Sequence, residues 1–188
     1  MFKVGFGYDS HRFDKKRKLV IGGVEITDQF GLAGHSDADV LLHALIDALL
    51  GSVGSRDIGS LFPDDDPNYK NISSITLLEN VVKIIKEKKF VVNNCDLVVV
   101  SEIPKLKPFR TQIVESIADV LSVESNKISF KATTNEKMGF IGRKEGMAAY
   151  AVVSVLEEKM VDFFNWLDSE GSNYDVSQRY NDSRSNNN

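Results

Sequence analysis

HSDADVLLHALIDALL, residues 35–50, decides the fold because it joins a polar start to a long apolar run with a helical period. Ser36 is expected to be the N-cap of this helix, and Asp39, three residues later, completes a capping box of the acidic kind. From Asp39 to Leu50 the run is rich in leucine and alanine. The sequence therefore predicts a largely apolar helix over residues 39–50.

One stripe of this predicted helix is polar. Asp39, His43 and Asp47 recur every four residues, so they lie on the same helical face. A polar stripe on an apolar helix faces water, a ligand or a polar interface, and a solvated face accounts for many such stripes. We interpret Asp39 as a helix cap and as a partner that supports His43.

The histidines extend the argument to the N-terminus. All three, His11, His35 and His43, lie in the first quarter of the chain, each close to a carboxylate. Asp9 and His11 are two residues apart on one predicted strand face, and His43 comes from the helix. Imidazole and carboxylate are ligands of zinc-like ions, and three protein ligands leave a position for a phosphate oxygen or water. A site at Asp9, His11 and His43 is therefore predicted, although His–Asp pairs are also ordinary hydrogen-bond partners.

Strands and helices alternate along the chain without a nucleotide-binding fingerprint, and we attribute Gly5-Phe6-Gly7 to flexibility at a strand end. A chain of 188 residues suits one domain, expected at 1–158. An extension at 159–188 is expected to hold a short helix near Phe163–Leu167 and a disordered tail from about 171. Strands are expected at 2–6, 19–21, 24–26, 97–100, 128–131 and 147–156, helices at 73–88 and 109–121, and a loop at 51–67.

Composition excludes several classes of protein. The net charge of −4 argues against a nucleic-acid binder. Cys95 is the only cysteine, so a disulfide framework and a thiolate zinc site are excluded. The N-terminus lacks the apolar core of a signal peptide, and no run reaches the length of a membrane helix. We expect a cytoplasmic protein that does not bind membranes.

Two further stretches carry polar groups suited to phosphates. Lys131–Lys137 combines hydroxyls, a carboxylate and two ammonium groups at a strand end, where a carboxylate beside phosphates could hold magnesium. Pro104–Pro108 brackets two lysines. Taken singly, a polar turn and a solvated basic loop explain them as well.

Four motifs in order resemble the 2-C-methyl-D-erythritol 2,4-cyclodiphosphate synthase family, over about residues 2–157. They are Asp-x-His at 9–11, His-Ser-Asp-x-Asp with a following histidine at 35–43, Asp-Ile-Gly-x-Leu-Phe-Pro-Asp at 57–64, and Lys-Ala-Thr-Thr-x-Glu-Lys-x-Gly-Phe-x-Gly-Arg at 131–143. The resemblance implies an α+β subunit whose mixed four-to-five-stranded sheet is covered by helices on one side. It also implies a homotrimer with active sites between subunits.

The resemblance implies an enzyme that releases CMP from 4-diphosphocytidyl-2-C-methyl-D-erythritol 2-phosphate as the 2-phosphate attacks the β-phosphate. Asp9, His11 and His43 would hold Zn²⁺ or another divalent ion, and Glu136 would hold Mg²⁺ or Mn²⁺ bridging the diphosphate. His35 and Thr134 would polarise the phosphates. Further substrate contacts would come from Ser10, Ser36, Asp57, Ile58 and Gly59, and from a lid at Phe62, Pro63, Asp64, Asp65 and Asp66. A cytidine pocket would be formed by Ser101, Glu102, Ile103, Pro104, Lys105, Leu106, Lys107, Ala132, Thr133 and Thr134. Asn135, Phe140 and Arg143 would complete the substrate contacts.

Two alternatives stay open. A zinc-dependent phosphoesterase acting on a nucleotide diphosphate would use the same ligands to activate water. A binding module for nucleotides or isoprenoid phosphates would need no chemistry at all.

Overall fold

The structure is a computed structural model that describes residues 1–63, 66 and 72–170. A five-stranded sheet has the order β4-β1-β7-β5-β6, and β2 and β3 form a separate hairpin. The strands are β1 (Phe2–Asp14), β2 (Leu19–Ile21), β3 (Val24–Thr27), β4 (Gly31–Leu32), β5 (Phe90–Val100), β6 (Ile128–Thr133) and β7 (Gly146–Glu157). The α-helices are α1 (Val40–Ser52), α2 (Ile58–Leu61), α3 (Ser74–Glu87), α4 (Arg110–Leu121), α5 (Gly139–Gly142) and α6 (Glu158–Glu170), with short 3-10 turns η2 (Lys107–Phe109) and η3 (Ser125–Lys127).

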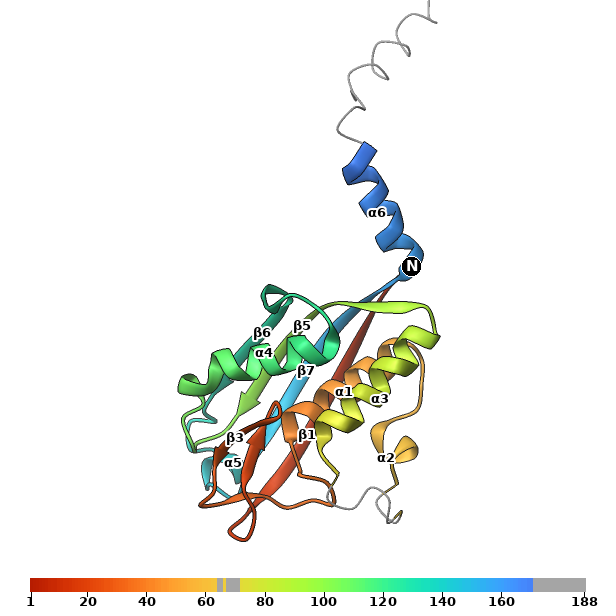
Figure 1. Ribbon diagram of the computed structural model, residues 1–188. Coiled ribbons are helices and arrows are strands. Elements are labelled where there is room, and N and C mark those ends of the chain that lie inside the picture. The colour runs from red at the N-terminus through yellow and green to blue at the C-terminus, as the bar shows by residue number, and fades with distance from the viewer. Residues whose placement is uncertain (64–65, 67–71, 171–188) are drawn as a thin grey trace, which may run out of the picture.

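The sheet is mixed, as expected. Strand β7 runs antiparallel to both β1 and β5, whereas β5 and β6 are parallel. Helices α1, α3 and α4 lie together on one face of the sheet (Figure 1), with α1 packed on β1 and β7 and α4 on β6. The expected α+β class and the helical layer on one side are confirmed. No helix among the described residues is long and apolar enough to cross a membrane.

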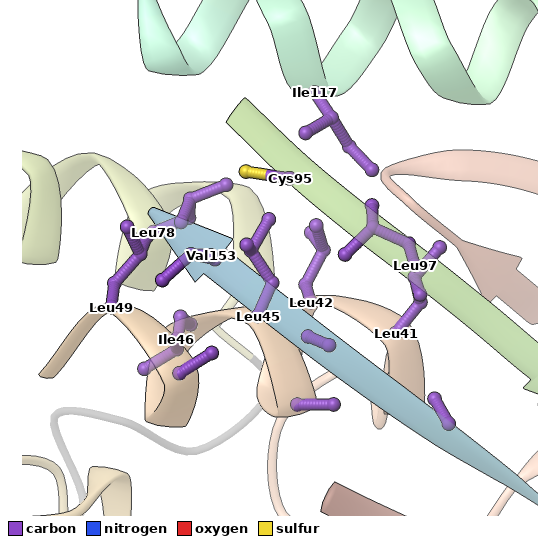
Figure 2. Close-up of a cluster of buried hydrophobic side chains, with 14 of the residues drawn as sticks. Leu41, Leu42, Leu45, Ile46, Leu49, Leu78, Cys95, Leu97, Ile117 and Val153 are labelled. Carbon is purple, nitrogen blue, oxygen red and sulfur yellow. The ribbon is translucent and has the colours of Figure 1, made fainter. Parts of the chain in front are cut away.

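The core lies between α1 and the sheet. Side chains of α1, among them Leu41 and Leu45, meet Leu97 of β5 and Val153 of β7, and Ile117 of α4 closes the cluster from above (Figure 2). Within α1 only His43, Asp47 and Gly51 are not fully buried. The helix is thus held by apolar contacts on nearly every side, which fixes the position of its few polar groups.

The predicted capping of α1 by Ser36 is wrong, because the helix begins at Val40 with Asp39 as its N-cap. The Asp39 carboxylate accepts hydrogen bonds from the backbone of Leu41 and Leu42, each at 3.1 Å. It also accepts one from Gly23 N at 2.7 Å. These bonds occupy Asp39 with backbone groups, so its expected role as a partner of His43 is wrong too.

The glycines of β1 are not points of flexibility. The strand continues to Asp14, so Gly5 and Gly7 lie in its interior. A Cβ at Gly5 would lie 1.8 Å from Ala48 O, and one at Gly7 would lie 1.9 Å from Ala44 O. The two glycines therefore allow α1 to pack directly on the backbone of β1.

Several elements are longer than predicted or were missed. Strand β5 begins at Phe90, and the predicted loop at 51–67 contains α2, whose N-cap is Asp57. Helix α6 begins directly after β7 and covers the place of the expected short helix. The expected tail from 171 to 188, and Asp64 and Asp65 of the expected lid, lie outside the described residues.

Candidate functional site

Strand β1 and helix α1 bring together three side chains with ligand atoms facing one point. His11 Nε2 and His43 Nδ1 lie 3.2 Å apart, and Asp9 Oδ2 lies 2.9 Å from the first and 3.0 Å from the second. Within the described residues, these three form the one group of His, Cys or acidic side chains with converging ligand atoms. We call Asp9, His11 and His43 the triad.

Hydrogen bonds to neighbouring serines decide which ring nitrogen of His43 carries the hydrogen. Its Nε2 lies 3.0 Å from both Ser36 Oγ and Ser74 Oγ. Ser74 Oγ donates its hydrogen to Asp37 Oδ1, so it offers only a lone pair to His43. The hydrogen of His43 therefore lies on Nε2, and Nδ1 faces the triad as a free lone pair. A histidine that ligates a metal is held in this way.

The charges of the triad suit a cation. Burial by itself raises the pKa of Asp9, but its interactions with the His11 and His43 imidazoles outweigh burial and hold that pKa well below its usual range. Burial lowers the pKa of His11, whereas its hydrogen bond to Asp9 raises it, and the net shift is upward. The backbone of Ala33 also hydrogen-bonds the His11 ring. Asp9 is thus ionised, and two imidazoles meet it at distances where a divalent ion would fit between the three.

The triad lies in a cavity of about 210 Å³, which we call the triad cavity. His43 and Asp47 both line it, so the polar stripe of α1 faces a cavity and not bulk solvent. Asp47 Oδ1 also accepts the backbone N–H of Ile58 at 2.8 Å, which ties α2 to the cavity wall. The other lining residues are Gly34, His35, Ser36, Ile58, Gly59, Phe62, Ile72 and Leu77.

Five of the predicted substrate-contact residues lie on this wall, namely His35, Ser36, Ile58, Gly59 and Phe62. His35 is exposed, whereas Ser36 is buried with its hydroxyl at His43. Asp57 is turned to cap α2, where it accepts the N–H of Ser60 at 2.8 Å. Pro63 is outside the lining, and Asp66 donates its backbone N–H to the Pro63 carbonyl. The substrate contacts of these residues stay predictions.

A second hollow, of about 290 Å³, lies at the other end of the sheet order, and we call it the β5–β6 hollow. All but one of the residues predicted for a cytidine pocket line it, the exception being Ile103, whose carbonyl accepts from Ser101 Oγ. The lining consists of Val99, Ser101, Glu102, Pro104, Lys105, Leu106, Lys107, Ala132, Thr133 and Thr134.

Within a single chain, the triad cavity and the β5–β6 hollow are far apart. The triad cavity is built on β1 and the β5–β6 hollow on β6, and β7 and β5 lie between these strands. Three steps between neighbouring strands amount to about 14 Å. The two sets of predicted site residues thus occupy separate parts of a single subunit.

A tight turn after β6 carries Glu136. Glu136 and Lys137 have φ values of 49° and 62°, in the left-handed region. Glu102 Oε1 accepts the N–H groups of Asn135 at 3.1 Å and of Lys137 at 3.0 Å, which holds this turn. Thr134 Oγ1 donates to Glu136 Oε1 at 2.9 Å. The carboxylate of Glu136 is therefore presented from a fixed turn, outside the triad.

The last two predicted residues lie near α5. Phe140 is exposed and borders a surface hollow together with Ser10 and His11. Arg143 forms an ion pair with Glu145, with N–O distances of 2.8 and 3.1 Å. Phe140 thus lies close to the triad residue His11, whereas Arg143 is paired with Glu145.

A family model described as the YgbB family matches residues 2–156. The chain belongs to this family. A 2-C-methyl-D-erythritol 2,4-cyclodiphosphate synthase of Caldicellulosiruptor bescii is 55% identical over 157 residues, which cover 84% of this chain and 100% of that protein. The predicted family and enzyme class are confirmed, since the shared region contains all four motifs.

Solved structures of this family share the fold. The bifunctional IspDF of Campylobacter jejuni matches with a TM-score of 0.81 and 42% identity, over 85% of this chain and 44% of that one. The Plasmodium falciparum IspF, solved as a CDP complex, matches with a TM-score of 0.73 and 32% identity, over 84% of this chain and 97% of that one. Both identities are high enough for the likeness to extend beyond the fold to the family.

Four residues of the site were missed from the sequence. Ser74 and Asp37 set the tautomer of His43, and Asp47 lines the triad cavity. Arg17 donates to the carbonyls of Gly34 and Ser36 and so fixes the loop that leads into α1. The sequence places Asp47 on the polar stripe with His43, but it does not assign Asp47 to the site.

Proposed function

We propose that this chain is a phosphorus–oxygen lyase that converts 4-diphosphocytidyl-2-C-methyl-D-erythritol 2-phosphate into 2-C-methyl-D-erythritol 2,4-cyclodiphosphate and CMP. The observation that carries the proposal is the convergence of Asp9, His11 and His43 in a cavity walled by Ile58, Gly59 and Phe62 of the family's third motif. The relatives carry the name of this enzyme.

The reaction is a phosphoryl transfer in which each predicted site residue has a separate role. An oxygen of the 2-phosphate attacks the β-phosphorus, the bond from that phosphorus to the bridging oxygen breaks, and CMP leaves with that oxygen. A divalent ion held by the triad, and Mg²⁺ or Mn²⁺ held by Glu136, would neutralise phosphate charge. His35 and Thr134 polarise the phosphates, and Lys105 and Lys107 add positive charge at the β5–β6 hollow. Because positioning and charge carry the reaction, no protein nucleophile is needed.

We also propose that the active site forms between two copies in a homotrimer. The sheet face opposite the helices carries exposed apolar side chains on paired strands, with Phe6 across from Val152 and Tyr8 across from Tyr150. We call this the open sheet face, made of Phe2, Val4, Phe6, Tyr8, Tyr150 and Val152, which are 39–63% exposed. An apolar face of this kind indicates contact with another protein surface. Neighbouring copies would bring one triad cavity to the next copy's β5–β6 hollow.

The assay for the function follows both products. Purified protein with Zn²⁺ and Mg²⁺ should release CMP from the cytidine substrate and leave a cyclic diphosphate, identified by mass spectrometry. A linear diphosphate that has gained one water would instead indicate the phosphoesterase. Sedimentation of the same sample should give the mass of three chains, and a monomer would contradict the shared site. A location in the cytoplasm is part of the proposal.

Removing the metal should abolish activity and lower stability. Dialysis against a zinc chelator should stop CMP release, and added Zn²⁺ should restore it. An ion at a hundred times its Kd stabilises the folded state by about 2.7 kcal/mol, which raises Tm by about 5–11 °C for a chain of this size. A thermal melt with and without Zn²⁺ measures this shift independently of turnover. The same Tm with and without Zn²⁺ would contradict a metal site at the triad.

Glu102 should act as a positioning residue for Glu136. Replacing it by alanine removes the acceptor for Asn135 N and Lys137 N, so the turn loses the bonds that hold its left-handed residues. Groups that support a metal ligand contribute about 10–100-fold in affinity or activity. Glu102→Ala should raise the Mg²⁺ concentration for half-maximal CMP release by that factor. Glu102→Gln keeps an acceptor oxygen, so its Mg²⁺ concentration for half-maximal CMP release should be close to that of the parent protein. Equal defects in both variants would mean that the charge of Glu102 acts on the substrate and that the residue does not position Glu136.

A further inference from the structure

The C-terminal helix α6 lies outside the region shared with the family. The family match ends at residue 156, and the Caldicellulosiruptor bescii relative is covered completely by 157 residues. Helix α6 spans Glu158–Glu170. Whatever this helix does is therefore additional to the reaction that the relatives share.

The helix presents a broad apolar surface that the described residues leave exposed. Met160, Phe163, Phe164 and Leu167 follow the spacing of one helical face, and we call them the α6 stripe. Phe163, Phe164 and Leu167 are 48, 47 and 39% exposed, and Trp166 beside them is 50% exposed. Phe163 contacts two neighbours on its own helix, with ring centroids 6.0 Å from Phe164 and 6.1 Å from Trp166. A surface this apolar needs a partner.

The base of the helix is fixed to the sheet, so the direction of α6 is set. Glu158 N donates to Lys89 O at 3.0 Å, and Lys159 Nζ lies 2.7 Å from Glu157 Oε2. In Figure 1, α6 leaves the body beyond the end of β7 and points away from the helical layer. With this orientation the α6 stripe cannot cover its own core.

Helix α6 follows β7, one of the two strands that carry the open sheet face. The last pair between β1 and β7 joins Phe2 to Leu156, and the preceding pairs on the same face lead to Phe6 and Val152. Helix α6 starts two residues after Leu156, with no linker. A copy that covers the open sheet face therefore brings its own α6 to the same end of the assembly.

The charges of α6 favour a second copy over a membrane or a nucleic acid. Residues 158–170 contain four carboxylates and one lysine. Anionic lipid and nucleic acid both attract basic helices, and this helix is acidic. Glu158, Asp162 and Asn165 lie on the face opposite the α6 stripe, where they stay in water when the stripes of neighbouring helices meet.

We infer that the α6 helices of neighbouring copies associate through the α6 stripe and form a helical bundle at one end of the assembly. The inference rests on the proposed trimer. It gives the subunits an apolar contact that lies outside the region matched by the family. Acidic residues at solvent positions keep the outside of the bundle polar.

Variants of the full chain with one added cysteine test the inference. Leu167→Cys lies in the stripe, and Asn165→Cys lies on the opposite face as a matched control. The native Cys95 is buried, and burial raises its thiol pKa to about 12, so it contributes little background. Mild oxidation should convert most Leu167→Cys chains to disulfide-linked dimers on a non-reducing gel, and few Asn165→Cys chains, because bridging needs Cα atoms within about 7 Å.

Sedimentation and CMP release on the unmodified chain separate the possible failures. A trimeric, active protein whose Leu167→Cys variant stays unlinked would overturn the helical bundle and leave the proposed function intact. Efficient linking in an inactive protein would support the bundle and contradict the function. Co-sedimentation with phosphatidylcholine–phosphatidylglycerol vesicles, together with unlinked Leu167→Cys, would assign the stripe to a membrane and overturn the inference.

Discussion

Replacing His43 by alanine should reduce CMP release by about a thousandfold. His43 Nδ1 is one of three converging ligand atoms, and its loss leaves Asp9 and His11 with too few ligands for tight binding. A metal that polarises a phosphate contributes several kcal/mol to the transition state, and each 1.36 kcal/mol is about tenfold in rate. Single-turnover kinetics at saturating Zn²⁺ and substrate measure the loss.

The fold should survive this change. His43 is only partly buried, and the hydroxyls of Ser36 and Ser74 that it leaves behind can bond each other across their 3.5 Å separation. Circular dichroism of His43→Ala should therefore match the parent protein, and zinc content should fall. Glu79→Ala, an exposed carboxylate on α3, is the matched surface control and should keep full activity. Turnover retained by His43→Ala would favour the non-catalytic binding module.

The triad could be predicted from the sequence because its ligand types are rare and close to distinctive motifs. The alternation of β1 places Asp9 and His11 on one face, and the period of α1 places His43 on the polar stripe. The network behind His43 could not be predicted in the same way. Ser74 is 31 residues from His43, and their contact depends on how α3 packs against α1. The sequence shows only that Ser74 is near a helix start.

Of the two caps of α1 predicted from the sequence, Asp39 is confirmed and Ser36 is wrong, for a related reason. Ser36 and Asp39 are both good capping residues, so local propensity does not choose between them. Tertiary contacts decide, because Asp39 also accepts Gly23 N from the β2–β3 hairpin and Ala38 adopts a φ of 58° just before the helix. Ser36 is then free to contact His43. The contact with Gly23 thus makes Asp39 the helix cap and leaves Ser36 to the site, and this contact joins residues that are distant in sequence.

Gly7→Ala should strongly destabilise the protein and disturb the triad as well. The new Cβ would lie 1.9 Å from Ala44 O and 2.7 Å from Ala48 N, both backbone atoms of α1, so neither can move away without the helix. Overpacking of this kind costs about 1–3 kcal/mol and occasionally more. At about 3 kcal/mol, Tm should fall by about 6–12 °C. Gly7 lies two residues before Asp9, so a displaced α1 should also weaken zinc binding at the triad.

Gly51→Ala is the matched control for this prediction, because it lies in α1 and a Cβ there meets no atom within 4 Å. It should stabilise the protein by about 0.5–1 kcal/mol, since alanine favours a helix more than glycine does. The two variants add the same methyl group, so opposite shifts in Tm would isolate the close approach of β1 and α1 as the cause. A Gly7→Ala protein with unchanged Tm and zinc affinity would mean that α1 can move off β1 without disturbing the triad, and that Gly7 does not set the site.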